Sequence, residues 1–309
     1  MKKLSLIIIA LAAVLFTQCK KEESNTEQTS QDSREIPVRL TLTNNDGSRT
    51  NFSDFLTDPN SPHATINWNK TGVETIYMAV PNIVIKNPIT GTVYETGECA
   101  QMVPLVAECN GSEKLVFTGS ISPSFLENGK SYTLYYFGNK TPNLTYSNEN
   151  GNLLGCEMTF NGQNGRRENL GNYHAALLDV SVSVPEYDEN GIATSFELVA
   201  SVPNFTSMTS VAYLDLEGVS ELSGTAVTES LSVAYNAAKN KFETTYVNDP
   251  IDLDPTMTNE SFVTLCPTAA GTTLECTKGT YTFENGVAAN GVYYAFDPET
   301  NTIQPLQWQ

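Results

Sequence analysis

The sequence is poor in the residues that most enzymes use for catalysis and metal binding. It contains two histidines, His63 and His174, among 309 residues. Two histidines exclude a three-histidine zinc centre, and positions 63 and 174 are too far apart for the H-E-x-x-H motif. No G-x-S-x-G, P-loop or G-x-G-x-x-G occurs. His63 follows Ser-Pro in an expected solvated loop, and His174 opens a strand pattern in which a partly buried, hydrogen-bonded imidazole is expected. The residues therefore predict no metal site, no cofactor and no enzymatic activity.

Positive charge and long hydrophobic runs are also scarce. The chain carries 17 lysines and arginines against 35 aspartates and glutamates, a formal net charge of −18. This acidic excess excludes nucleic acid as a partner, and it would repel an anionic lipid surface. The apolar run at residues 4–16, broken only by Ser5, is 13 residues long, whereas a membrane-spanning helix needs about 20. Attachment to a membrane would therefore have to be covalent.

The N-terminal region has the organisation of a secretory signal. Two lysines precede the apolar run, and Thr17-Gln18-Cys19 follows it. A cysteine at this place resembles the bacterial lipobox, in which the thiol receives a diacylglycerol and the preceding residues are removed. Phe16 and Gln18 depart from the usual lipobox residues, and an ordinary signal peptide with an incidental cysteine is the alternative. We expect residues 1–18 to be a lipoprotein signal peptide and Cys19 to be acylated.

The residues after this cysteine indicate a tether. Residues 20–34 contain no apolar side chain, so they cannot bury surface, and residues 19–34 are expected to be disordered. Lys20-Lys21-Glu22-Glu23 resembles the export signal that directs lipoproteins of Bacteroides-type bacteria to the outer face of the outer membrane. We therefore expect a surface-exposed lipoprotein, held in the outer membrane by its lipid anchor.

From Ile36 onward the apolar residues recur with a period of two, which is typical of half-buried β-strands. In the first strand Ile36, Val38, Leu40 and Leu42 occupy every second position. Further β-rich runs follow, separated by Asn-Gly, Asp-Gly and Pro turn signals. This pattern predicts an all-β protein of two β-sandwich domains in tandem. Residues 35–170 and 171–309 are the expected domains, because the polar, glycine-rich stretch at residues 161–169 suggests a boundary close to Leu170.

Five cysteines follow the signal region. Cys99 and Cys109 are ten residues apart, as are Cys266 and Cys276, a spacing that would place each pair on neighbouring strands of a hairpin. Disulfides and buried free thiols are both compatible with this spacing, and Cys156 has no evident partner.

Four segments of the chain carry recognisable patterns. They are residues 66–78 (Trp68, a short turn, Gly72, then a strand), residues 129–137 (an aromatic strand), residues 173–182 (His174, alanines, then alternating valines) and residues 262–267 (a strand ending in Pro267). Together, and in this order over residues 36–309, they resemble the fimbrillin-like proteins, which are pilus subunits and related surface lipoproteins of Bacteroides-type bacteria. One departure is Gly72-Val73, where the family usually has Gly-Asp.

The resemblance implies two transthyretin-like β-sandwiches and assembly by strand exchange. In such pilins an arginine-directed protease removes the first strand, and a strand of the next subunit fills the groove left behind. Applied to this sequence, the exchanged strand carries Ile36, Val38, Leu40 and Leu42, and Arg49, in a turn-rich loop, is the candidate processing site. An uncleaved surface arginine is the alternative reading of Arg49.

The C-terminal segment at residues 303–308 alternates well enough to be a donor strand or a closing strand, and Pro305 confines it to a sheet edge. The expected function is that of a structural subunit or anchor of a cell-surface fimbria that supports adhesion. Its partners would be other fimbrial subunits, the outer membrane and ligands on host or bacterial surfaces. The alternative is a surface glycan-binding lipoprotein of a polysaccharide-uptake system, with Trp68 and Trp308 as candidate sugar contacts.

Overall fold

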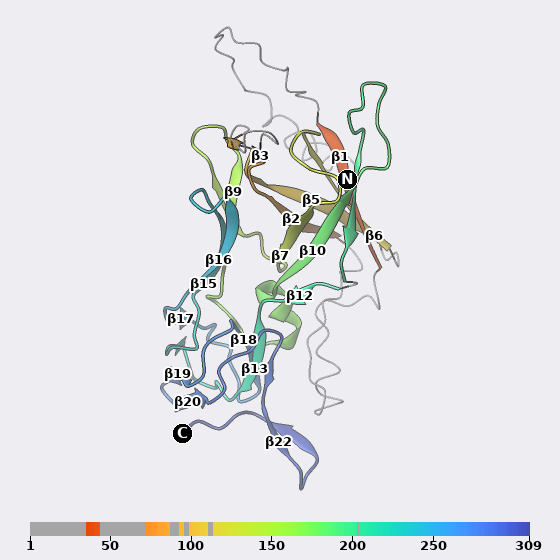
Figure 1. The fold of residues 1–309 in the computed structure, drawn as a ribbon. Helices are drawn as coiled ribbons and strands as arrows, with labels where there is room; N and C mark the ends of the chain where they lie inside the picture. Colours follow the sequence, from red (N-terminus) through yellow and green to blue (C-terminus); the bar gives the residue numbers. More distant parts are fainter. Residues whose placement is uncertain (1–34, 44–71, 87–92, 96–98, 111–113, 203) are drawn as a thin grey trace, which may run out of the picture.

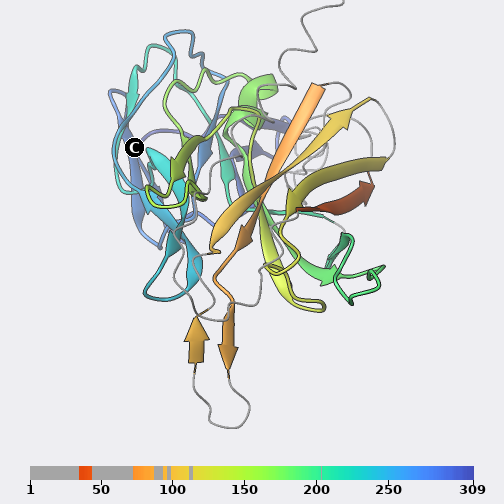
Figure 2. The same ribbon diagram turned by 90° about the horizontal axis from the view of Figure 1, so that it is seen from above.

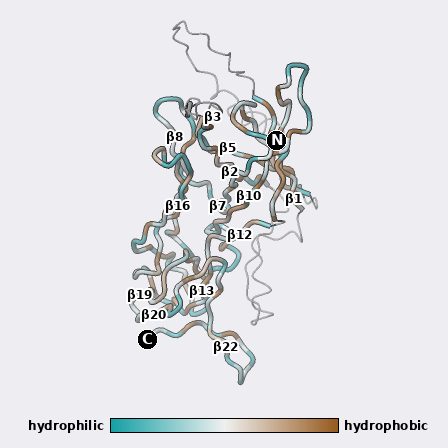
Figure 3. Tube along the Cα trace, in the orientation of Figure 1, coloured by the Kyte–Doolittle hydropathy of each residue, from teal (hydrophilic) through white to brown (hydrophobic). Residues whose placement is uncertain are grey.

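The computed structural model describes residues 35–43, 72–86, 93–95, 99–110, 114–202 and 204–309. Within these ranges the chain is almost entirely β-structure, and its one helical element is the 3-10 helix η1 (Arg167–Tyr173). The prediction of an all-β protein is therefore confirmed. Hydrophobic residues gather along the strands, and the connecting loops are mostly hydrophilic (Figure 3). No helix in the described ranges is long and apolar enough to cross a membrane.

The largest sheet surrounds the N-terminal core (Figure 1). Among the described residues it contains eight strands, in the order β11-β1-β6-β5-β2-β7-β10-β12, and β11 also pairs with β10. The row therefore closes on itself, and all of these strands except β12 form a ring around one apolar core. The strands are β1 (Ile36–Thr43), β2 (Gly72–Val80), β5 (Gln101–Cys109), β6 (Lys114–Ile121), β7 (Ser131–Phe137), β10 (Ala175–Ser183), β11 (Phe196–Ala200) and β12 (Thr206–Ser207).

Strands β2, β7 and β10 contribute to two cores, one on each face. In β7, Leu134 and Tyr136 belong to the core inside the ring, whereas Tyr135 and Phe137 belong to a second apolar core outside it. Tyr77 of β2 packs edge-on against Phe137 in that second core, with the ring centroids 5.9 Å apart. This double burial explains why β7 reads as a nearly continuous apolar run rather than as a strict alternation.

A four-stranded sheet contributes the other side of the second core. It consists of β16 (Lys241–Val247), β15 (Ser230–Asn236), β9 (Leu153–Thr159) and β8 (Asn143–Tyr146), in this order. β9 pairs with β15, whereas β10, the next strand along the chain, pairs with β7 in the ring. The sheets therefore do not divide at residue 170, between the expected domains 35–170 and 171–309. Each large sheet takes strands from both sides of that position.

The remaining strands are short. A three-stranded sheet contains β18 (Ser261–Leu265), β13 (Ser210–Leu214) and β21 (Val292–Tyr293). The other pairs in the described chain are β14 (Glu221–Leu222) with β17 (Ile251–Asp252), β19 (Thr272–Cys276) with β20 (Gly279–Phe283), β22 (Ala295–Asp297) with β23 (Thr302–Gln304), and β3 (Val84–Lys86) with β4 (Val93–Glu95). The β3–β4 hairpin projects from the body (Figure 2), and so does the β22–β23 hairpin (Figure 1).

The polar stretch at residues 161–169 is tied into the fold. Gln163 is only 1% exposed, and its side-chain amide pairs with the backbone of Thr264. Nε2 donates to the Thr264 carbonyl oxygen at 3.2 Å, and Oε1 accepts from the Thr264 N–H at 2.7 Å. The Phe262 N–H donates to the Gly165 carbonyl at 2.8 Å. These residues satisfy backbone groups along β18 in place of a neighbouring strand, so their polarity does not mark a solvated linker.

Within the described residues, no disulfide joins the cysteines at positions 99, 109, 156, 266 and 276 to one another. Cys99 precedes β5 and Cys109 ends it, so the pair lies at opposite ends of one strand, and the hairpin expected for it is wrong. β5 has nine residues, which at about 3.3 Å per residue puts the two thiols roughly 30 Å apart. A disulfide needs Cα atoms within about 7 Å. Burial raises the pKa of Cys156 and of Cys266 to about 12, so both stay protonated and unreactive.

Candidate strand-exchange groove at strand β1

Strand β1 lies between two strands that are distant from it in the sequence. It pairs antiparallel with β6 along all of its eight residues. On its other side it pairs parallel with β11, over Val38–Leu40. The closed ring therefore passes through β1, and no other strand joins β6 to β11 in the described structure.

The alternation predicted for this strand is present, and its inward side chains are enclosed. Leu40 lies opposite Phe117 of β6 and Leu198 of β11, which are also buried. Burial of each side chain of this size contributes roughly 1.5–3 kcal/mol, so β1 is held firmly. The exposed fractions are 3% for Ile36, 0% for Val38, 0% for Leu40 and 6% for Leu42, and the three residues between them are exposed.

Removal of β1 would open a groove between β6 and β11. Both strands would then present backbone N–H and C=O groups without partners, which is the usual template for an added strand. The four inward side chains of β1 would leave empty pockets, and these pockets would be lined by the apolar core of the ring. Such a groove matches an extended peptide that carries an apolar residue at every second position.

Gly119 brings β5 close to β6 beside this groove. A Cβ atom at Gly119 would lie 2.5 Å from Leu105 Cδ2 and 2.7 Å from the Pro104 carbonyl oxygen. Because the second contact is with backbone, which cannot rotate away, a larger residue would push β5 from β6. Gly119 lies opposite Val38, so this close approach fixes the wall against which β1 packs.

The chain contains five arginines. At three of them the backbone is hydrogen-bonded within the fold, which hinders cleavage by a protease. Arg39 lies within β1, where the backbone is paired on both sides. Arg166 and Arg167 lie where η1 begins, and the Arg166 carbonyl accepts the Asn169 N–H at 3.1 Å. Proteases cut most readily at exposed loops that are not tied down in this way. The other two, Arg34 and Arg49, stand before and after β1 in the sequence and lie outside the described residues.

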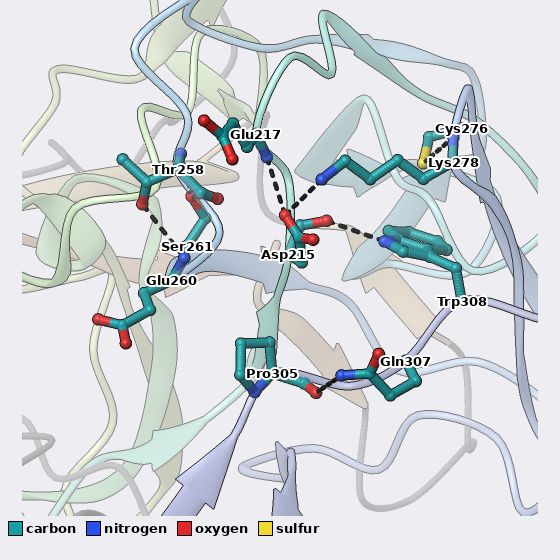
Figure 4. Close-up of polar contacts among 10 residues, drawn as sticks. All are labelled: Asp215, Glu217, Thr258, Glu260, Ser261, Cys276, Lys278, Pro305, Gln307 and Trp308. Carbon is teal, nitrogen blue, oxygen red and sulfur yellow. Dashed lines mark hydrogen bonds and ion pairs between the residues drawn. The ribbon is translucent and has the colours of Figure 1, made fainter.

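Two further candidate residues from the sequence, Cys19 and Trp68, also lie outside the described residues. Trp308 is partly buried against the second core, and its indole Nε1 donates to the Asp215 carbonyl oxygen at 2.8 Å (Figure 4). The protein itself holds this indole, so it is not presented as an open platform for a sugar. The segment around it closes a sheet edge, because Leu306 pairs with Leu214 of β13 and is buried.

His174 lies between η1 and β10 and is 3% exposed. Its Nε2 has no hydrogen-bond partner among the described residues, so the hydrogen-bonded imidazole expected from the sequence is not formed at this atom. Burial lowers the pKa of His174 from 6.5 to about 4. The imidazole is therefore neutral at pH 7 and shielded from solvent.

Other kinds of site find less support in the described part of the chain. No group of three His, Cys, Asp or Glu side chains there could hold a metal ion. A pocket beside β8, lined in part by Phe137, Lys140 and Met158, has a volume of about 40 Å³. Ligand sites usually measure roughly 300–1,000 Å³, so this pocket has room only for water.

No protein-family model, no curated protein and no solved structure matches this chain. The likeness to fimbrillin-like proteins therefore rests on the four sequence segments alone. Within the described residues, the groove that β1 fills is the arrangement with the most defined geometry.

Proposed function

We propose that this chain is a structural, non-enzymatic subunit or anchor of a cell-surface fimbria that assembles by exchange of β-strands. The observation that carries the proposal is the burial of all four inward side chains of a terminal strand that closes the ring between β6 and β11. After loss of β1, a strand of the next subunit takes its place. The resemblance to fimbrillin-like proteins implies the same assembly, and it implies two transthyretin-like sandwiches in tandem.

The position of Arg49 supports this route. Residues 44–71, which are 71 − 43 = 28 residues, separate β1 from Gly72, where the ring resumes. A cut after Arg49 would separate β1 from the rest of the chain without breaking any described strand. A cut after Arg39, Arg166 or Arg167 would fall within paired or hydrogen-bonded backbone. An arginine-directed protease is therefore a partner of the chain in this proposal.

We expect Arg49→Ala to abolish assembly while leaving the folded subunit intact. Without the cut, β1 stays in the groove and excludes an incoming strand. The melting temperature should not change, because the sequence predicts a turn-rich loop at this position, where substitutions usually matter little. The measurement is electron microscopy of surface filaments, together with N-terminal sequencing of the protein within them.

Arg166→Ala is the matched control, because it removes an arginine that has no part in this route. It should be processed and should assemble like the wild type. Filaments built from Arg49→Ala protein with residue 36 still attached would overturn the strand-exchange route. That result would favour the alternative function, a surface glycan-binding lipoprotein.

The same proposal places the chain on the outer face of the outer membrane, through acylation of Cys19. A lipid chain contributes about 0.8 kcal/mol per buried methylene, and the apolar run at residues 4–16 is too short to span a bilayer. We expect Cys19→Ala protein to be absent from the outer membrane fraction and from the cell surface. Cell fractionation with surface labelling measures this, and membrane retention of the variant would contradict the lipid anchor.

A further inference from the structure

The last four residues of the chain lie in a slot between two strands of different sheets. Where the slot begins, the Leu306 N–H donates to the Tyr213 carbonyl of β13 at 3.1 Å. At its other end Gln309 exchanges two hydrogen bonds with Thr280 of β20, its N–H donating at 2.9 Å and its carbonyl accepting at 3.3 Å. Residues 306–309 therefore bridge β13 and β20, which do not pair with each other.

Two side chains of this segment point into the protein, and the residue between them does not. Leu306 is 6% exposed and belongs to the second core, against which the Trp308 indole also packs. The Trp308 Nε1–H bond to the Asp215 carbonyl fixes the orientation of the indole (Figure 4). Gln307 is exposed, and within the described part of the chain its side chain bonds only to the nearby Pro305 carbonyl, at 3.0 Å. The slot thus holds Leu306 and Trp308 by two apolar contacts and one directed hydrogen bond.

The slot is shaped around the backbone of its occupant. At Gly279 the φ angle is +144°, and a Cβ atom there would lie 2.6 Å from the Gln309 carbonyl oxygen and 3.2 Å from Trp308 Cβ. Any other residue at this position would collide with the docked segment. Beside the indole, Lys278 forms an ion pair with Asp215, whose carboxylate also accepts the Glu217 N–H at 3.2 Å. These contacts hold the Asp215 backbone where Trp308 needs its acceptor.

The docked segment is joined to the body through the projecting β22–β23 hairpin (Figure 1). Each strand of this hairpin has three residues, and its turn contains Asn301 at φ +53°. Exchange of an identical element between copies of a chain is a low-cost route to a dimer, and this hairpin is the link that would carry residues 306–309 to a second copy. Every copy carries the same segment on the same arm.

We propose that the slot between β13 and β20 is a binding site for a C-terminal Leu-x-Trp-x segment, and that it accepts this segment from a second copy of the chain. The proposal rests on contacts of residues 306–309 and does not depend on the release of β1. Its occupant is an extended peptide of defined pattern, bound through both backbone and side chains.

The first test cuts the link after the protein has folded. A protease recognition sequence replaces residues 299–301 in the hairpin turn of the full chain, and the purified protein is then cleaved. We expect residues 302–309 to stay bound on size-exclusion chromatography and to exchange with a labelled synthetic peptide of the same sequence. In the peptide, Trp308→Ala should raise the dissociation constant about tenfold and Leu306→Asp about a hundredfold, and each factor of ten corresponds to about 1.4 kcal/mol of binding free energy. Gln307→Ala is the matched control and should bind like the native peptide.

The second test supplies the segment from a whole chain. Cleaved protein is mixed with an excess of uncleaved Gly279→Ala protein, whose own slot the added Cβ closes. We expect a one-to-one complex, and we expect none when the Gly279→Ala chain also carries Trp308→Ala. If the cleaved protein keeps its melting curve and yet binds no labelled peptide, the slot is no binding site. If the native and substituted peptides all bind the cleaved protein equally, the slot does not recognise Leu-x-Trp. If the peptide binds but the Gly279→Ala chain does not, the segment does not exchange between copies.

Discussion

Replacing Leu40 by aspartate is expected to destabilise the folded chain by about 4 kcal/mol or more. Leu40 is 0% exposed and lies between Phe117 and Leu198. The substitution removes an apolar side chain from the ring core and leaves a carboxylate there without a described partner. Domains have a total stability of about 5–15 kcal/mol, so a large share of it would be lost. Thermal or urea unfolding of the purified protein measures the effect, with a fall in melting temperature of about 10 °C or more.

Thr41→Asp is the matched control, because it introduces the same charge one residue further along the same strand. Thr41 is exposed on the outer face of the ring, so this change should alter stability by about 0.5 kcal/mol at most. Equal melting curves for the two variants would show that β1 does not pack in the core. The groove, and with it the proposed strand exchange, would then have no physical basis.

The inward side chains of β1 were predictable because they depend on a local rule. A strand that buries one face must place apolar residues at every second position, and Ile36, Val38, Leu40 and Leu42 follow this rule. The flanking strands were not predictable in the same way. β11 begins at Phe196, far along the chain, and no local pattern specifies which distant edge a strand will join. The closure of the ring is therefore a property of the structure that the sequence pattern does not reveal.

The membership of the sheets on either side of residue 170 was not predictable for a related reason. Asn161 to Asn169 is polar and rich in glycine, which is typical of a linker, yet Gln163 is buried because its amide pairs with the Thr264 backbone. A buried polar side chain with satisfied hydrogen bonds cannot be told from a solvated one by composition. β9 and β10 flank this stretch but belong to different sheets. β9 pairs with β15, which begins more than 70 residues further along the chain, and no local pattern specifies that pairing.

The contacts of Trp308 could not be predicted from the sequence either. A tryptophan near the end of an all-β chain suggests an exposed platform for a sugar. The structure instead gives its Nε1–H an acceptor in the Asp215 carbonyl and packs its ring against the second core. Asp215 lies 93 residues away, so no spacing or motif indicates the contact. The signal that was available is the alternation of Leu306 and Trp308, which marks a segment with one buried side.

The buried imidazole of His174 should make the stability of the protein depend on pH in the mildly acidic range. In the unfolded chain a histidine has a pKa of about 6.5, whereas burial lowers the pKa of His174 in the folded chain to about 4. Between these values the unfolded state binds a proton that the folded state does not bind. Stability from this group is therefore fully present above pH 6.5, falls as the pH decreases towards 4, and does not change further below it.

We expect this group alone to cost about 2 kcal/mol of unfolding free energy between pH 7 and pH 5. Carboxylates also make the stability depend on pH. We therefore compare the loss of unfolding free energy between pH 7 and pH 5 in the wild type with the loss in His174→Phe, each measured by urea unfolding. His174→Phe should lose about 2 kcal/mol less than wild type, because phenylalanine does not titrate. His63→Phe removes the other histidine, which the sequence places in a solvated loop, and it should behave like wild type. Equal pH dependence in wild type and His174→Phe would show that the folded protein protonates His174 as readily as the unfolded chain does, and that the imidazole is not enclosed.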